Sequence, residues 1–417
     1  MQIKNLDKIQ IFLISLIPLL LISGPFLPDL FFTVSGIFFI FFVLRKKKFF
    51  YLRNKYFVIF LIWNVYLIIN SILSNFPFNS LESSLFYFRF LLGSFSIFYL
   101  LNEFKIFEKF LLIGIYSALS ILILDSCLQI ITGFNLLNYP LDNRLSSLFG
   151  EEKKMGSFII RILPLFLILN IKFFTNYNIH QKIFFFIIVL FSCFLVILTL
   201  ERTSIILLFI FIFFLFFILI SDLKKLIFSL IFFIIISILS LQNLPTLKNR
   251  LINLTFNEMF YNDQFFIISP QYHSHFETAF KMFLDKKLFG HGPKMYRYLC
   301  SQEKYQAFFY NKISSCSTHP HNTYLQLLSE TGIIGTIPVI FLFFYLAYYL
   351  FKINMDKINN KFFASKKNKI CFSIIILSIL VNLFPISTTG NFFNNWISIM
   401  YFLPFGYFIY YDYISKK

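Results

Sequence analysis

Histidine is concentrated in one segment of this chain. Only His180 lies outside residues 272–322, which hold the other five of the six histidines: His273, His275, His291, His319 and His321. An imidazole exchanges a proton near neutral pH, so it can serve as a general acid or base. This segment is therefore the candidate for proton-transfer chemistry.

His321 has the sequence context of a residue that precedes a helix. Pro320 disfavours helix before it, Asn322 is a good N-cap, and Thr323 with Gln326 is an alternative capping-box pair. The partial positive charge of a helix N-terminus disfavours a protonated imidazole, which leaves His321 neutral and able to accept a proton. The exposed N–H groups there could hold an anionic leaving group. The alternative is a histidine that only caps a helix entering a membrane.

The composition indicates which elements must position these residues. The chain is 58% hydrophobic and 13% charged, which suits a lipid bilayer rather than the small interior of a soluble domain. Apolar runs long enough to cross about 30 Å of hydrocarbon recur throughout. We expect an all-α membrane protein with about twelve spans, at residues 9–24, 29–44, 56–74, 84–101, 110–131, 157–174, 183–200, 203–221, 226–241, 328–352, 370–385 and 393–411.

The net charge of +18 indicates orientation rather than nucleic-acid binding. Of the 37 basic residues, 22 lie in the connectors and termini on one side of the expected spans. The positive-inside rule makes that side cytoplasmic and places both termini there, in the cell inner membrane. Residues 1–241 then hold nine spans, 242–327 form a large, partly helical periplasmic loop, and 328–417 hold three spans. The first apolar run has no cleavage site and is expected to stay as a span.

The cysteines agree with this orientation. Cys127, Cys193 and Cys371 lie in or beside apolar runs, as small buried hydrophobic residues do. Cys300 and Cys316 both lie in the large loop, where an oxidising compartment would allow a disulfide worth about 3 kcal/mol. Two free thiols are the alternative. No spacing of Cys and His is typical of a metal site, and no cofactor is expected.

A longer motif around His321 resembles a known signature. His321-Asn322, nine residues and then Gly332-x-x-Gly335 resemble the signature of the O-antigen ligase and polymerase superfamily. The run Phe289-Gly290-His291-Gly292-Pro293 resembles its glycine turn, and the expected topology is similar. Phe384-Pro385 and residues 389–393 resemble its C-terminal part. The resemblance covers roughly residues 130–400 and is strongest at 287–335.

This resemblance implies an inverting glycosyl transfer. The donor would be a glycan on a polyprenyl diphosphate, such as undecaprenyl diphosphate, and His321 would draw the proton from an acceptor hydroxyl. A ligase uses a lipid A–core sugar as acceptor, whereas a polymerase uses a second lipid-linked glycan. No metal is implied, so arginine or lysine must neutralise the diphosphate.

Several cations are candidates for that role. Arg202 resembles the family's arginine at the start of a span, although an interfacial charge can also simply snorkel to water. Arg144 resembles a recurrent family arginine. Arg89 and Arg161 lie within or beside apolar runs, where a charge suggests either function or a structural pair.

The chain departs from the family in one place. The family usually has an arginine about twenty residues before the glycine turn, but residues 269–277 contain none. His273 or His275 stands nearest, and Lys294 or Arg297 could take the role instead. We expect Arg297 to contact the diphosphate, and His319 and Asn322 to support His321 or the acceptor. Glu330 either orients a cation or the acceptor, or is merely solvated.

A transporter is the alternative from another functional class. Transporters place polar residues near the bilayer midplane, in broken helices of two related halves. In this chain the ionisable cluster lies at the expected outer surface, and the halves show no evident relation. The sequence therefore favours the enzyme.

Overall fold

The computed structural model describes residues 5–142, 144–220, 224–225, 227, 231, 245–261, 264–266, 268–307, 315–355 and 365–416. The helices in these ranges are α1 (Asn5–Leu20), α2 (Phe26–Arg45), α3 (Lys55–Ile72), α4 (Pro77–Ser84), α5 (Phe88–Glu103), α6 (Phe107–Thr132), α7 (Met155–Phe173), α8 (Ile179–Leu198), α9 (Arg202–Leu219), α11 (Pro245–Lys248), α12 (Leu254–Met259), α13 (Pro270–Asp285), α14 (Tyr296–Leu299), α15 (Thr323–Met355), α16 (Lys366–Asn382) and α17 (Asn395–Ile414). The two short strands β1 (Phe260–Tyr261) and β2 (Gln264–Phe265) pair antiparallel.

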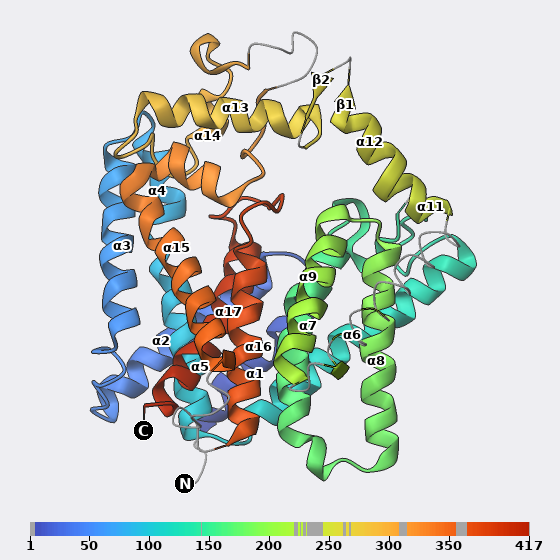
Figure 1. The fold of residues 1–417 in the computed structure, drawn as a ribbon. Coiled ribbons are helices and arrows are strands. Elements are labelled where there is room, and N and C mark those ends of the chain that lie inside the picture. The colour runs from blue at the N-terminus through green and yellow to red at the C-terminus, as the bar shows by residue number, and fades with distance from the viewer. Residues whose placement is uncertain are drawn as a thin grey trace.

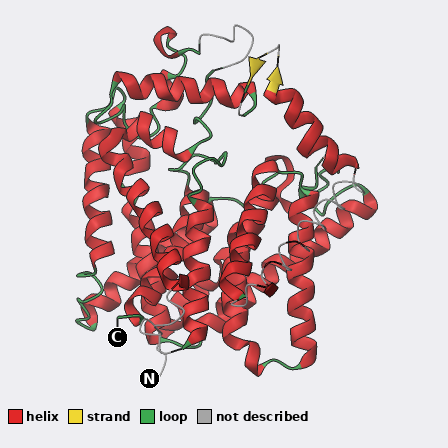
Figure 2. Ribbon diagram, in the orientation of Figure 1, coloured by secondary structure: helices red, strands yellow, loops and turns green. Residues whose placement is uncertain are grey.

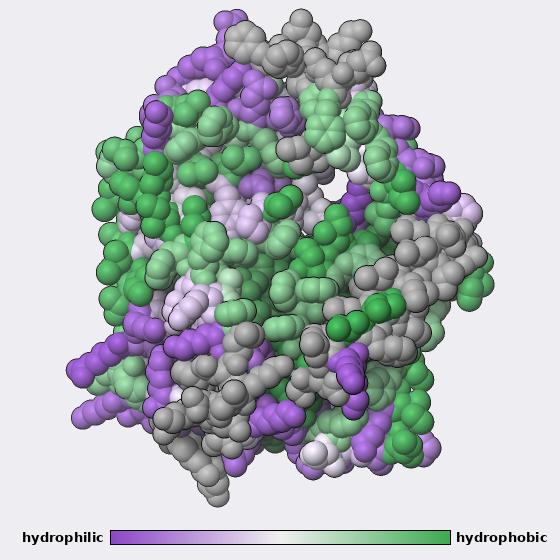
Figure 3. Space-filling model, viewed as in Figure 1, coloured by the Kyte–Doolittle hydropathy of each residue, from purple (hydrophilic) through white to green (hydrophobic). Residues whose placement is uncertain are grey.

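Most of the long helices stand roughly side by side, and the connecting segments lie mostly at the two ends of this bundle (Figure 1). Both termini lie at one end, whereas α12, the β1–β2 hairpin, α13 and α14 cover the other (Figure 1). The described structure is almost entirely helical, and the hairpin is its only sheet (Figure 2). A hydrophobic band separates the two more hydrophilic ends on the visible face (Figure 3).

The expected spans correspond closely to these helices. Eleven of the twelve overlap α1, α2, α3, α5, α6, α7, α8, α9, α15, α16 or α17, and most of the twelfth, 226–241, lies outside the described residues. Eight helical segments within the described ranges are long and apolar enough to cross a membrane. Helices α1 and α16 are shorter, with 16 and 17 residues. An all-α, multi-pass membrane protein is thus confirmed, and the number twelve stays a prediction.

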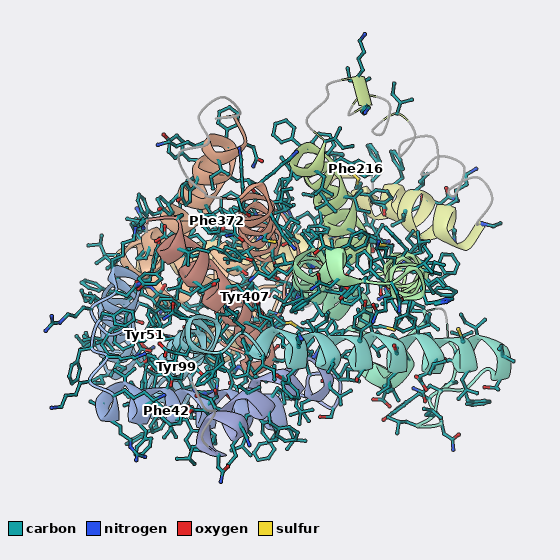
Figure 4. All side chains as sticks on the ribbon, turned by 90° about the horizontal axis from the view of Figure 1, so that it is seen from below. Phe42, Tyr51, Tyr99, Phe216, Phe372 and Tyr407 are labelled. Atoms are coloured by element: carbon teal, nitrogen blue, oxygen red, sulfur yellow. A yellow bond between two sulfur atoms is a disulfide. The ribbon has the colours of Figure 1, made fainter. Side chains whose placement is uncertain are left out.

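Two features of the sequence explain how these apolar helices pack. Small residues allow close approach: a Cβ on Gly114 of α6 would lie 1.9 Å from the carbonyl oxygen of Ser15 in α1. Aromatic rings fill the wider gaps. Near the end with the termini, the Tyr99 ring stacks on Phe42 at 5.8 Å and meets Tyr51 edge-on at 5.8 Å (Figure 4).

Candidate active site

Helix α15 begins as its cap residue predicts. The side-chain oxygen of Asn322 accepts hydrogen bonds from the backbone N–H groups of Tyr324 (3.0 Å) and Leu325 (3.1 Å). Its amide donates to the carbonyl oxygen of Pro385 at 2.7 Å, which ties the helix to the segment between α16 and α17. The alternative capping box is not used, since the Gln326 amide donates to Glu330 and Asn391 instead.

His321 occupies the turn immediately before this cap. Its backbone has φ +57°, in the left-handed region, and its carbonyl oxygen accepts a hydrogen bond from the N–H of Thr389 at 2.9 Å. Three rings surround the imidazole: those of His319, Tyr272 and His275 lie 4.1, 5.2 and 5.5 Å from it, centroid to centroid. Within the described part of the chain, neither ring nitrogen of His321 makes a hydrogen bond, so both remain available to a substrate.

The protonation of the cluster is set mainly by burial. Burial, with a smaller contribution from His275, lowers the pKa of His321 to about 4. Burial and then the neighbouring His321 lower the pKa of His319 to about 3, and burial also lowers the pKa of His275. All three imidazoles are therefore neutral at pH 7. The sequence attributed the neutrality of His321 to the helix N-terminus, whereas in the structure burial of the ring is the main cause.

The two supporting histidines are held by backbone carbonyls. The Nε2–H of His319 donates to the oxygen of Thr389 at 3.3 Å, and its Nδ1 accepts from the Thr318 hydroxyl at 2.9 Å. The Nδ1–H of His275 donates to the oxygen of Ser315 at 3.2 Å. These contacts fix one neutral tautomer of each ring beside His321.

The other two histidines of the segment lie elsewhere. His273 is exposed on α13, with its ring against Phe266 at 5.4 Å. His291 is buried in the glycine turn, where its Nε2–H donates to the oxygen of Met282 at 3.0 Å. Neither ring is placed against His321 in the described structure.

A cavity of about 440 Å³ adjoins the histidine cluster. Tyr272 and Thr389 line it, and both also contact His321 or its backbone. The molecule is hollowed on this side, between α12 and the upper end of α9 (Figure 3). The charged residues of the lining are five cations and two carboxylates, namely Arg144, Lys154, Arg161, Arg202, Arg250, Glu201 and Glu258. This excess of positive charge makes the cavity suited to a polyanion.

Arg202 is turned into this cavity and paired. Its Nη1 and Nη2 donate to the two carboxylate oxygens of Glu258 on α12 at 2.6 and 3.0 Å. Its Nε donates to the backbone oxygen of Arg250 at 3.2 Å. These three acceptors fix the orientation of the Arg202 guanidinium group. A charged side chain that only extends toward water would not be held in this way.

Arg161 and Glu201 form the buried wall of the cavity. Arg161 is only 6% exposed; its Nη1 donates to the backbone oxygen of Ser157 at 2.9 Å, and its Nε has no hydrogen-bond partner among the described residues. Glu201 accepts from the N–H groups of Gly156 (2.8 Å) and Ser157 (3.0 Å) at the start of α7. Burial raises the pKa of Glu201. The Nε–H of Arg161 is therefore a buried hydrogen-bond donor that a ligand in the cavity could satisfy.

Sequence reasoning did not single out Arg250, Lys154 or Tyr272 as site residues. Arg250 lies 48 positions from Arg202, and its own Nε is also buried without a partner in the described ranges. Lys154 lines the cavity while pairing with Glu152 at 2.6 Å. Arg250 and Lys154 could have been suspected from residue type, because both are basic and lie outside the apolar runs. Their positions in the sequence gave no indication that they reach the cavity.

Three other expected site residues lie outside the cavity lining. Arg89 pairs with Asp29 at 2.9 and 3.2 Å and also donates to Asn395 at 2.9 Å, contacts that favour the structural pair. Arg297 is exposed on α14, close enough to His319 to lower its pKa further. Glu330 is fully buried rather than solvated and accepts from the N–H of Tyr296 at 3.1 Å.

The signature glycines bring the glycine turn onto α15. Gly290 and Gly332 have φ +70° and +63°, and a Cβ on Gly332 would lie 2.2 Å from the oxygen of Leu288. The N–H groups of His291 and Gly292 donate to the oxygens of Ser329 (3.0 Å) and Glu330 (2.7 Å). The two motifs that resembled the family therefore pack backbone against backbone.

A disulfide joins the remaining part of this region. Cys300 follows α14 and Cys316 precedes the turn that carries His319 and His321, with Cα atoms 5.1 Å apart. Cys127, Cys193 and Cys371 are free. Among the residues that the structure describes, no group of three or more His, Cys, Asp or Glu could hold a metal ion.

Comparison with known families agrees with this geometry. The family described as O-Antigen ligase matches residues 187–340, which include α9 with Arg202, the glycine turn and the His321 motif. A search of curated proteins found no match. The family implies an enzyme of the glycosyltransferase type that acts on lipid-linked glycans. Residues 187–340 are thus similar to the O-antigen ligase family, and the apolar helices make this chain a multi-pass membrane protein.

Proposed function

We propose that this protein transfers a glycan from undecaprenyl diphosphate, or a related polyprenyl diphosphate, to a hydroxyl of a lipid A–core sugar. His321 is the general base, and the cationic cavity holds the donor diphosphate. The observation that supports this most is the junction between the two. The neutral His321 ring contacts Tyr272, and Tyr272 lines the cavity that contains five cations.

The reaction uses both parts at once. The acceptor oxygen attacks the anomeric carbon of the glycan while its proton passes to a ring nitrogen of His321. The bond between the anomeric carbon and the phosphate oxygen breaks, and its electron pair leaves with the diphosphate. Attack from the side opposite the leaving group inverts the anomeric centre.

The cavity supplies donors for the leaving group. Arg202 presents a bidentate fork, and the buried Nε atoms of Arg161 and Arg250 have no partner in the described structure. Hydrogen bonds from fixed cations stabilise developing negative charge more than mobile water does. We propose that these side chains, rather than a metal, neutralise the diphosphate.

The site is proposed to face the periplasm. Both termini lie at the end opposite α13 (Figure 1), the helix that holds Tyr272 and His275 against His321, and the lysine-rich connectors lie at the end with the termini in the expected topology. Labelling of single cysteines, placed at the exposed His180 and the partly exposed Lys281, with a membrane-impermeant maleimide would test this. The expected result in whole cells is labelling at 281 and protection at 180.

The function is tested with purified protein in proteoliposomes, a defined lipid-linked glycan and two alternative acceptors. Transfer to lipid A–core is expected, and His321→Ala is expected to abolish it without loss of abundance. His180→Ala, at the exposed start of α8, is the matched control. Product formed only on a second lipid-linked glycan would identify a polymerase. Full activity of His321→Ala would remove the base from the mechanism.

A further inference from the structure

A second, apolar cavity of about 290 Å³ lies between α9, α15 and α16. Hydrophobic side chains line it, including Ile210, Phe214 and Phe217 of α9 and Ala347 and Phe351 of α15. We call this cavity the α9 groove. Phe214, Phe217 and Phe351 are 41, 36 and 58% exposed, so the groove is open at the surface of the described bundle.

The α9 groove continues the cationic cavity. Phe384 lines both. Helix α9 also runs along both, because its first turns, from Arg202 to Leu207, line the cationic cavity and Ile210–Ile218 line the groove. Ile206, Ile210, Phe214 and Phe217 are spaced four, four and three residues apart, so they share one face of the helix. A charged head site thus leads into an apolar channel along a single helix face.

The length of this face suits one leaflet of a bilayer. Ile206 and Phe217 are eleven residues apart, which is about 16 Å at 1.5 Å per residue. The hydrocarbon core of a bilayer is about 30 Å thick, so half of it is about 15 Å. A lipid whose diphosphate sits beside Arg202 would therefore place its first chain segment along the whole stripe.

We propose that the α9 groove binds the hydrocarbon tail of the lipid diphosphate donor. This inference rests on the proposed function, which places the diphosphate in the cationic cavity. The tail would anchor the donor so that its anomeric carbon stays beside His321 while the diphosphate is held by arginines. Chain length would then be a determinant of donor binding, separate from the charge of the head group.

A second apolar groove provides an internal control. It has a volume of about 370 Å³ and is lined by α3, α15, α16 and α17. None of the described residues that line it also lines the cationic cavity. Val339 of α15 lies in this second groove, as Ala347 of the same helix lies in the α9 groove. Val339 and Ala347 are both small and half-buried. A bulky substitution at Val339 therefore perturbs only the second groove, and one at Ala347 perturbs only the α9 groove.

The experiment compares Ala347→Trp with Val339→Trp, using two donors that carry the same glycan diphosphate on a long or a short isoprenoid chain. Ala347→Trp is expected to raise the KM for the long-chain donor about tenfold or more and to leave the KM for the short-chain donor unchanged. Val339→Trp is expected to change neither. Equal effects on both donors, or the same effect from Val339→Trp, would overturn the proposal.

A second measurement uses the unmodified protein, in case Ala347→Trp does not fold. A long-chain isoprenyl diphosphate with a photoreactive group on its chain is expected to crosslink to peptides of α9 or α15 that line the α9 groove. Crosslinks confined to the second groove would reject the assignment. If the wild-type protein transfers glycan from neither donor, the proposed function fails, whereas transfer that is insensitive to Ala347→Trp rejects only the tail site.

Discussion

Glu258 holds Arg202 by both carboxylate oxygens, at 2.6 and 3.0 Å. This is the geometry in which an arginine binds phosphate, so the carboxylate occupies the place that a donor phosphate would take. Because Glu258 belongs to the short helix α12, the cavity contains its own competing anion. In the proposed function, donor binding would displace or share this contact.

Removing the charge of Glu258 should strengthen donor binding. Glu258→Gln leaves a neutral side chain opposite Arg202, and we expect the KM for the donor to fall about three- to tenfold with little change in kcat. Steady-state kinetics at fixed acceptor concentration measure this. Glu277→Gln is the control, because Glu277 pairs with Lys281 on α13 and does not line the cavity. A higher KM for Glu258→Gln would show that Glu258 supports the site rather than competing with the donor.

Substitution of Arg202 should separate charge from geometry. Arg202→Ala removes charge-assisted hydrogen bonds worth about 1.5–3 kcal/mol, which corresponds to about 10- to 150-fold in kcat/KM. Arg202→Lys keeps the charge without the fork and should retain intermediate activity. Wild-type kinetics of Arg202→Ala would show that the donor does not use this residue.

Arg89 provides the contrasting case for an arginine with a structural role. Its pair with Asp29 and its bond to Asn395 connect α2, α5 and α17. We expect Arg89→Ala to lower the thermal unfolding temperature while the KM of the remaining folded enzyme stays unchanged. A raised donor KM with unchanged stability would place Arg89 at the substrate instead.

The pH dependence should report the buried base. Burial lowers the pKa of His321 to about 4, so the neutral, proton-accepting form persists as the pH falls and is lost only near pH 4. The kcat/KM should therefore not show the decline near pH 6.5 that an ordinary histidine gives. Tyr272→Ala exposes the ring and should raise that pKa. The variant should consequently lose about tenfold more activity at pH 5.5 than at pH 7.5, relative to wild type. Parallel profiles for the two proteins would contradict this account.

The disulfide should stabilise the loop that carries His321. Cys300 and Cys316 are 16 residues apart, and closing a loop of this size contributes about 3 kcal/mol. We expect Cys316→Ser to lower the unfolding temperature and, by loosening the turn, to lower kcat. Cys371→Ser, at a free cysteine buried in α16, is the control for loss of a sulfur atom. Equal behaviour of the two variants would mean that the disulfide adds nothing.

Local patterns in the sequence predicted local structure well. Apolar runs predicted eleven helices because a helix that crosses a bilayer needs about 20 consecutive, predominantly apolar residues. Asn322 predicted the start of α15 because a cap depends only on the next three residues. The family motif located His321 within the matched segment.

Contacts between distant segments could not be read in this way. Histidine count alone grouped His273 with His275, but residues two apart on a helix point to nearly opposite sides, and only His275 faces His321. Arg250 and Tyr272 reach the cavity through the path of α12 and α13, which no local pattern specifies. Arg89 is neutralised by Asp29 and donates a hydrogen bond to Asn395, 306 positions away.

The turn that carries His321 is fastened on every side. Thr389 donates to its backbone, Asn322 binds Pro385, and the disulfide fixes the chain just before it. The backbone that carries the imidazole is therefore held in place. In the proposed function, acceptors would then be selected by reach, because the free hydroxyl of the acceptor sugar must come to this fixed turn, and the length of the arm that bears the sugar would matter as much as its chemical identity.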